Sequence, residues 1–157
     1  MKKQLALLVM LLVAALLCLS AAALDVYVAD GGTGDGLTKE TPLGTMEAAL
    51  DAAKDGGRII IVGTATLDQP LVEPAHANPI TVTGGTLIFN QSPYCRWYLS
   101  GPTAFENLTI TYADANTTRS ALIVARFHPL TLGTKVTVTL RSFILVGGYQ
   151  FPLMPDE

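Results

Sequence analysis

One short stretch of this 157-residue chain combines side chains that could bind a sugar. "SPYCRWYLSG", residues 92–101, places Tyr94, Trp97 and Tyr98 within five residues, with Arg96 among them. Exposed aromatic rings stack on sugar rings, and a guanidinium donates hydrogen bonds to sugar hydroxyls. In an extended strand Arg96 and Tyr98 share one face and Trp97 takes the other. Tyr94, Arg96 and Tyr98 are therefore candidate carbohydrate-binding residues. The alternative is that Trp97 fills the interior and only one tyrosine is exposed.

A second pair, Arg126 and His128 in "ARFHP", follows an apolar run at what reads as a solvent-facing turn. A cation beside an imidazole can bind a polar ligand, so both residues are further ligand-binding candidates. The alternative for this pair is an ordinary solvated turn. His76, in the proline-rich "EPAHANP", is expected at the surface.

The glycine-rich "DGGTGDG", residues 30–36, could in principle bind phosphate or calcium. A phosphate loop needs a helix that begins at once with Lys-Ser or Lys-Thr, whereas Lys39 is followed by Glu40. An EF-hand needs alternating acids and a closing glutamate, and calcium-binding β-roll repeats need several copies. We therefore predict a turn in which Asp30 and Asp35 accept hydrogen bonds from local backbone amides, with no cofactor and no metal. A surface calcium held by Asp30, Asp35 and carbonyls is the remaining alternative.

The spacing of apolar residues along the chain shows which elements must position these side chains. "LDVYVAD" alternates as a short edge strand does. Met46, Ala49, Leu50 and Ala53 then form one apolar stripe, which predicts a helix of about ten residues. Thr45 is expected to cap this helix, Lys54 to lie in its last turn and Gly56-Gly57 to end it.

After Gly57 the chain consists of short β-branched runs separated by Gly, Pro, Asn or Ser. Apolar positions recur at intervals of 17 to 24 residues: Ile60 to Ile80, Val82 to Leu99, Leu99 to Ile123, and Ile123 to Ile144. A period near 20 with two or three strands predicts an all-β solenoid, a parallel β-helix of about four to five coils. Its interior should hold Ile, Val, Leu and Phe. Its outer face should hold the alternate threonines Thr81, Thr83, Thr109, Thr111, Thr137 and Thr139. A hairpin sandwich is the alternative, because Gly84-Gly85 is also a hairpin signal.

"VYVADGGTGDGLTKETPLGTMEAALDAAKDGGRIIIVGT" resembles the N-terminal entry of right-handed parallel β-helix proteins of the pectate-lyase-like superfamily. The close similarity covers about 40 residues, and the rest of the chain matches only in its coil rhythm. The resemblance implies a right-handed β-helix with an N-terminal capping α-helix. It implies no particular reaction, because the superfamily includes lyases, hydrolases, adhesins and surface proteins.

Enzymes of this superfamily use an Arg or Lys base near a calcium held by clustered carboxylates, or aspartates on neighbouring coils. The acids within these coils are Asp68, Glu73, Glu106 and Asp114, and each falls at a different coil position. We therefore assign no catalytic residue. The alternative function is the N-terminal part of a polysaccharide lyase or glycoside hydrolase, because "SFILVGGYQFPLMPDE" starts another coil and then stops.

Residues 1–23 have the pattern of a signal peptide, with two lysines, an apolar run and the small residues of an A-x-A cleavage site. An uncleaved membrane anchor is the alternative. Residues 24–57 then hold the first strand, the loop and the capping helix, and residues 58–157 hold the coils. The mature 134 residues carry 8 basic and 13 acidic side chains, a charge of about −5, and one cysteine, Cys95. This composition predicts no nucleic-acid partner, no internal disulfide and, after cleavage, no membrane association.

The expected function is that of a secreted or cell-surface module, a scaffold or adhesin-like binder. Its expected partner is a polysaccharide or a host or cell-surface glycan. A purely structural fragment without a ligand is the third possibility.

Overall fold

The computed structural model describes residues 24–90, 96–113, 121–125, 128–139 and 143–147, and these form three parallel β-sheets and one helix. Sheet A holds, in spatial order, β1 (Leu24–Val28), β2 (Gly57–Ile61), β5 (Ile80–Thr83), β8 (Thr103–Glu106) and β11 (Leu130–Leu132). Sheet B holds β3 (Thr64–Leu67), β6 (Thr86–Phe89), β9 (Thr109–Tyr112) and β12 (Thr137–Thr139). Sheet C holds β4 (Leu71–Val72), β7 (Arg96–Tyr98), β10 (Ala121–Ala125) and β13 (Phe143–Gly147).

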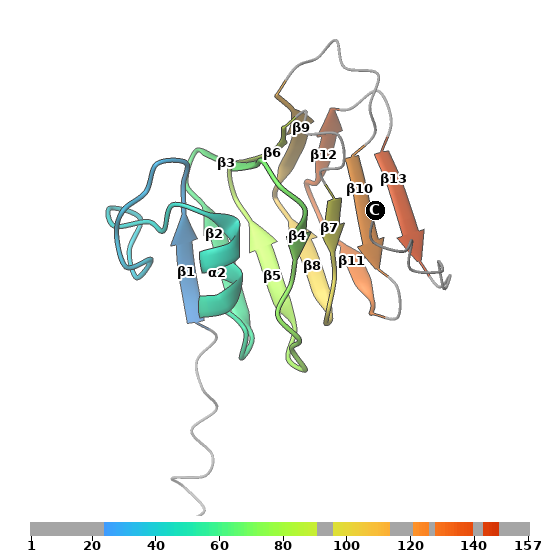
Figure 1. Ribbon diagram of the computed structural model, residues 1–157, viewed down its shortest axis with the longest axis horizontal. Helices are drawn as coiled ribbons and strands as arrows, with labels where there is room; N and C mark the ends of the chain where they lie inside the picture. Colours follow the sequence, from blue (N-terminus) through green and yellow to red (C-terminus); the bar gives the residue numbers. More distant parts are fainter. Residues whose placement is uncertain (1–23, 91–95, 114–120, 126–127, 140–142, 148–157) are drawn as a thin grey trace, which may run out of the picture.

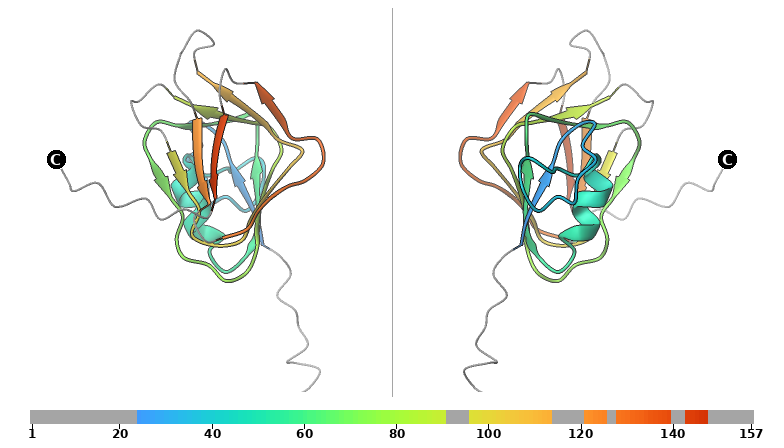
Figure 2. Two further views of the ribbon diagram at one scale, coloured as in Figure 1. Left: turned by 90° about the vertical axis from the view of Figure 1, so that its right-hand side faces the viewer. Right: turned by 90° about the vertical axis from the view of Figure 1, so that its left-hand side faces the viewer.

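From β2 onward the chain visits sheets A, B and C in the same order four times. Each strand pairs in parallel with the strand one visit earlier, so the strands stack side by side along the molecule (Figure 1). Seen along the stacking direction, the sheets surround a common interior (Figure 2). The fold is therefore β-rich and solenoid-like, and every strand pair among the described residues is parallel.

The hairpin alternative was therefore wrong, and Gly84-Gly85 has a different role. These two glycines, with φ of +76° and +52°, connect β5 in sheet A to β6 in sheet B. A β-carbon on Gly85 would lie 2.5 Å from the carbonyl oxygen of Gly63, at the corresponding corner of the preceding visit. The corner is tight because both positions have left-handed backbone and a close neighbour, so glycine is required there.

The repeat length also differs from the expectation. Paired residues in sheet A stand at positions 58, 81, 104 and 131, which are steps of 23, 23 and 27. In sheet B they stand at 64, 86, 109 and 137, steps of 22, 23 and 28. The intervals inferred from the sequence were shorter because they joined apolar residues that look alike but do not pair in register. Val82, for example, pairs with Phe105 and not with Leu99. The C-terminal run is also different from the expectation, because β13 completes the fourth visit to sheet C instead of starting a further coil.

The inward and outward faces follow the alternation that the sequence predicts. One continuous apolar cluster fills the interior, and its largest fully buried side chains include Trp97, Phe89, Phe105 and Met46. All six predicted threonines lie on outward positions, half-buried or exposed. In sheet B, Thr64, Thr86, Thr109 and Thr137 stand in register as one outward column.

Helix α2 (Met46–Ala52) contacts β1, β3 and β4 at one end of the molecule (Figure 1). Its apolar stripe, Met46, Ala49, Leu50 and the C-cap residue Ala53, is buried in the same cluster as the strands. The Thr45 hydroxyl accepts a hydrogen bond from the Ala48 amide at 3.2 Å, as predicted. The helix is shorter than expected, so Lys54 lies beyond its last turn.

Candidate functional site

Strand β7 divides the predicted sugar-binding stretch between two faces. Trp97 points inward and is fully buried, with its ring centroid 5.4 Å from that of Phe105. Arg96 and Tyr98 lie half-buried on the outward face, where Arg96 Nη1 donates to the Tyr98 hydroxyl at 3.3 Å. Trp97 therefore fills the interior, and Arg96 and Tyr98 share the opposite face of the strand, as its alternation predicts. Tyr94 and Arg126 lie outside the described residues.

The surroundings of Tyr98 are mostly aliphatic. It pairs with Val72 of β4 on one side and Val124 of β10 on the other. Val72 is 64% exposed, whereas Val124 is 4% exposed. We call Arg96, Tyr98 and Val72 the β7 strip. It offers a phenol ring, a guanidinium and an aliphatic surface side by side, which suits one amphipathic face of a sugar ring.

The other predicted ligand residue is elsewhere. His128 is half-buried at the corner that precedes β11 of sheet A, whereas the β7 strip belongs to sheet C. The structure therefore brings Arg96 and Tyr98 together and leaves His128 on a different part of the surface.

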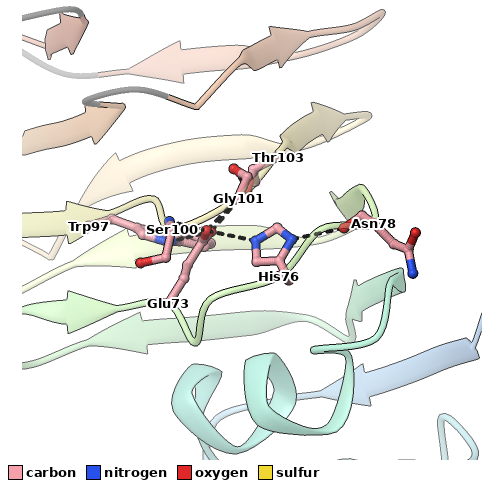
Figure 3. A network of polar contacts seen from close by, with 7 residues as sticks. All are labelled: Glu73, His76, Asn78, Trp97, Ser100, Gly101 and Thr103. Carbon is pink, nitrogen blue, oxygen red and sulfur yellow. Dashed lines mark hydrogen bonds and ion pairs between the residues drawn. The ribbon is translucent and has the colours of Figure 1, made fainter.

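Directly beneath β7 lies a buried polar cluster that the sequence interpretation missed (Figure 3). The side chains of Glu73 and His76 are 0% exposed, and Glu73 Oε2 lies 3.1 Å from His76 Nε2. Trp97 Nε1 donates to Glu73 Oε1 at 2.9 Å, and the Ser100 amide donates to Oε2 at 3.0 Å. The Thr103 hydroxyl lies 3.2 Å from both carboxyl oxygens. Residues from three successive segments therefore converge on one carboxyl group.

The partners of this cluster restrict where its protons lie. His76 Nδ1 is 2.8 Å from the Asn78 carbonyl oxygen, which can only accept, so Nδ1 carries a hydrogen. Trp97 Nε1 and the Ser100 amide can only donate, so each occupies an acceptor site of Glu73. One further proton then lies between His76 Nε2 and Glu73 Oε2. That proton joins Glu73 and His76 in a hydrogen bond inside the core, and the other donors fill the remaining acceptor sites of the carboxyl group.

The expectation that His76 is a surface residue is therefore wrong. Its ring packs against Gly101, where a β-carbon would lie 2.4 Å from ring atoms. Because the Glu73 and His76 side chains are closed off from solvent, no ligand reaches this cluster. It holds β7 in place: Glu73 accepts from the Trp97 side chain and its amide donates to the Tyr98 carbonyl at 3.0 Å. Glu73 is thus a positioning residue for the β7 strip.

The glycine-rich loop is a set of turns, as predicted, and Asp35 accepts from a local amide, but the expectation of a local partner is wrong for Asp30, whose partners lie more than 30 residues later in β3. Asp30 accepts from the Thr66 amide at 2.7 Å and from the hydroxyls of Thr64 and Thr66. Partial burial acts to raise the pKa of Asp30, but these hydrogen bonds outweigh it and leave the pKa below 3.8. Glycine is needed at Gly36, where φ is +76°.

Asp35 has its own partners, the Leu37 amide at 3.0 Å and the Thr41 hydroxyl at 2.7 Å. These hydrogen bonds lower the pKa of the exposed Asp35 carboxyl below 3.8. Beside the loop, an open cleft of about 470 Å³ is lined in part by Asp30, Glu47 and Asp68. Within the described ranges, no three His, Cys, Asp or Glu side chains come together as a metal site. Calcium at Asp30 and Asp35 stays a hypothesis.

Two findings do not concern the candidate site itself. In the part of the chain that the structure describes, no helix has the length and apolar character needed to cross a membrane. Comparison with protein-family models, curated proteins and solved structures gave no match to this chain.

Proposed function

We propose that this protein is an exported or cell-surface module that binds carbohydrate through the β7 strip and does not act as an enzyme on its own. Its coils form a right-handed parallel β-helix, and residues 1–23 are removed as a signal peptide. The parallel register of all three sheets and the repeated A–B–C order support the β-helix. The expected partner is a polysaccharide or a cell-surface glycan.

The observation that carries the binding proposal is the placement of Arg96 and Tyr98 on one outward face of β7. The Tyr98 ring supplies a surface for the C–H face of a sugar, and the Arg96 guanidinium supplies donors for its hydroxyls. The rigid core beneath them, with Trp97 bound to Glu73, keeps both side chains on a fixed strand. Such preorganisation lowers the entropic cost of binding.

The test is a glycan array probed with the exported protein, its Tyr98→Ala and Arg96→Ala variants, and Tyr98→Phe. Tyr98→Ala should abolish the signal, because the stacking surface is lost, whereas Tyr98→Phe keeps the ring and should retain most of it. Thr81→Ala, on the outward face of sheet A, is the matched control and should bind as the wild type does. Binding that survives both alanine variants would refute the β7 strip as the site.

The rival, a polysaccharide lyase or glycoside hydrolase of which this chain forms the N-terminal part, makes a different prediction. Incubation with pectin-like polymers and calcium should then produce unsaturated or reducing ends. We expect neither product. Sequencing the N-terminus of the exported protein tests the signal peptide separately, and Leu24 should be its first residue.

A further inference from the structure

The two ends of the strand stack differ in how well the apolar interior is covered. At the end where the chain begins, α2 covers the apolar interior, and Met46, Ala49 and Leu50 are at most 1% exposed. The loop that precedes α2 also pairs with the outermost strand of sheet A. Tyr27 donates its amide to the Gly36 carbonyl and accepts from the Leu43 amide, at 2.8 and 2.9 Å.

The outer strand of sheet B is closed at the same end by Asp30. Its amide donates to the Thr64 carbonyl at 2.8 Å, and its carboxylate accepts from the Thr66 amide at 2.7 Å. Asp30 thereby occupies hydrogen-bonding groups of β3 that another strand would otherwise use. This end is protected in the way that natural sheet edges generally are.

At the opposite end, β11, β12 and β13 are the last strands of their sheets, and each has a strand neighbour on one side only (Figure 1). Leu132 and Val138 continue inward columns of the core but are 51% and 39% exposed. Their register partners one visit earlier, Phe105 and Ile110, are fully buried. Among the described residues, the interior is therefore open here, next to three free strand edges.

We propose that this open end, defined by Leu132, Val138 and the edges of β11, β12 and β13, pairs with the same end of a second copy of this chain. The surface that complements a free strand edge beside an apolar interior is another such edge and interior. The helix-covered end of a second copy does not present one. Two open ends therefore meet about a twofold axis, and association stops at a dimer instead of continuing as a filament.

The charges at this end oppose contact between identical surfaces only weakly. Residues 128–139 contain one lysine, Lys135, and one histidine, and no acid, although the whole chain has a net charge of −3. Strands "LTL" and "TVT" have none of the lysines or prolines that usually prevent edge pairing. Like-charge repulsion is therefore small at the open end.

The size of this end sets the expected strength. Strands of three to five residues at ~3.3 Å per residue are about 10–17 Å long, so the end face that three of them enclose is small. The area that two such faces bury is below the ~1,200 Å² of a standard stable interface, so we expect weak association, with a dissociation constant in the micromolar range or above. The dimer is thus concentration-dependent.

Sedimentation velocity of the exported protein between about 5 and 500 µM tests this proposal. The wild type should shift from monomer to dimer and go no further. Leu132→Lys combined with Val138→Lys places two charges on already exposed positions, so the fold should tolerate them, and the dissociation constant should rise at least ~10-fold. Leu37→Lys, a control at an exposed leucine in the loop at the helix-covered end, should dimerise as the wild type does.

Three results would overturn the proposal: a monomer throughout the range, continued growth into larger species, or an unchanged dimer in the double variant. A wild-type monomer that dimerises once residues 148–157 are deleted would show that the chain's own C-terminal segment occupies this end instead. Because neither lysine variant alters Arg96 or Tyr98, failure of the dimer leaves the sugar-binding proposal intact, and the converse also holds.

Discussion

Replacing Glu73 by glutamine tests the role of the buried polar cluster with almost no change in volume. The carboxyl group accepts from Trp97 Nε1 and the Ser100 amide, and it shares a hydrogen bond with His76 Nε2. A glutamine keeps one oxygen and places an NH₂ group where the second oxygen faced donors, so one or two buried donors lose their acceptor. Each such loss costs about 1–3 kcal/mol.

Glu73→Gln should therefore lower the free energy of unfolding by about 2–4 kcal/mol. A domain of this size is stable by about 5–15 kcal/mol, so the loss is large but leaves most of the protein folded. Trp97 is the only tryptophan, so its fluorescence reports unfolding in urea directly. Because Trp97 also bonds to Glu73, circular dichroism should follow the same transition as an independent probe.

Glu106→Gln is the matched control, because Glu106 is an exposed glutamate at the end of β8. Its effect should stay within about 0.5 kcal/mol. A loss below about 1 kcal/mol for Glu73→Gln would show that the cluster is held weakly and contradict the role assigned to Glu73. A double-mutant cycle with His76→Gln should give a coupling energy above about 1 kcal/mol, since the two side chains contact directly.

Three further predictions concern glycines and the loop. Gly101→Ala should destabilise by about 1–3 kcal/mol, because the new β-carbon would lie 2.4 Å from the His76 ring; urea unfolding measures it. Gly85→Ala should cost more than Gly31→Ala in the same assay: both have positive φ, but Gly85 also faces backbone carbonyl oxygens within 2.7 Å, whereas a β-carbon on Gly31 meets nothing within 4 Å. Equal costs would contradict the packed corner. Asp30 has a folded-state pKa below 3.8, so its stabilisation is present above about pH 4 and is lost as the pH falls through the folded value. Asp30→Asn should therefore show a smaller loss of urea stability than the wild type on going from pH 5 to about pH 2.

Local features of the fold could be predicted because their causes are local. The apolar residues from Met46 to Ala53 recur at helical spacing, which predicts the helix directly. Thr45 caps this helix by accepting from the Ala48 amide three residues later. The threonine positions followed from alternation within single strands. The glycine-rich loop could be interpreted as a turn because its sequence lacks the ligands that each ion-site template requires.

Features set by partners far along the chain could not be predicted. The register depends on the length of every corner, and corners range from the two-residue Gly84-Gly85 to longer connections, so apolar similarity alone misplaced the repeat. His76 was expected at the surface because "EPAHANP" is polar and proline-rich, and Glu73 was one of several acids at unrelated coil positions. Their burial depends on Trp97, Ser100 and Thr103, which lie 24 to 30 residues later. A glutamate three residues before a histidine was the only local signal.

The position of this cluster explains why a carboxylate is buried in an otherwise apolar core. Strand β4 has only two residues, and the chain then turns through Pro74 and Pro79, which have no amide hydrogen to donate. The corner therefore lacks many of the backbone hydrogen bonds, the ladder, that join successive strands elsewhere. Glu73 substitutes for that ladder: its amide pairs with Tyr98 of the next visit, and its side chain accepts from Trp97 and Ser100. Since Tyr98 carries the proposed sugar contact, Glu73→Gln should weaken both folding and glycan binding, whereas Tyr98→Ala should abolish binding with a smaller effect on stability.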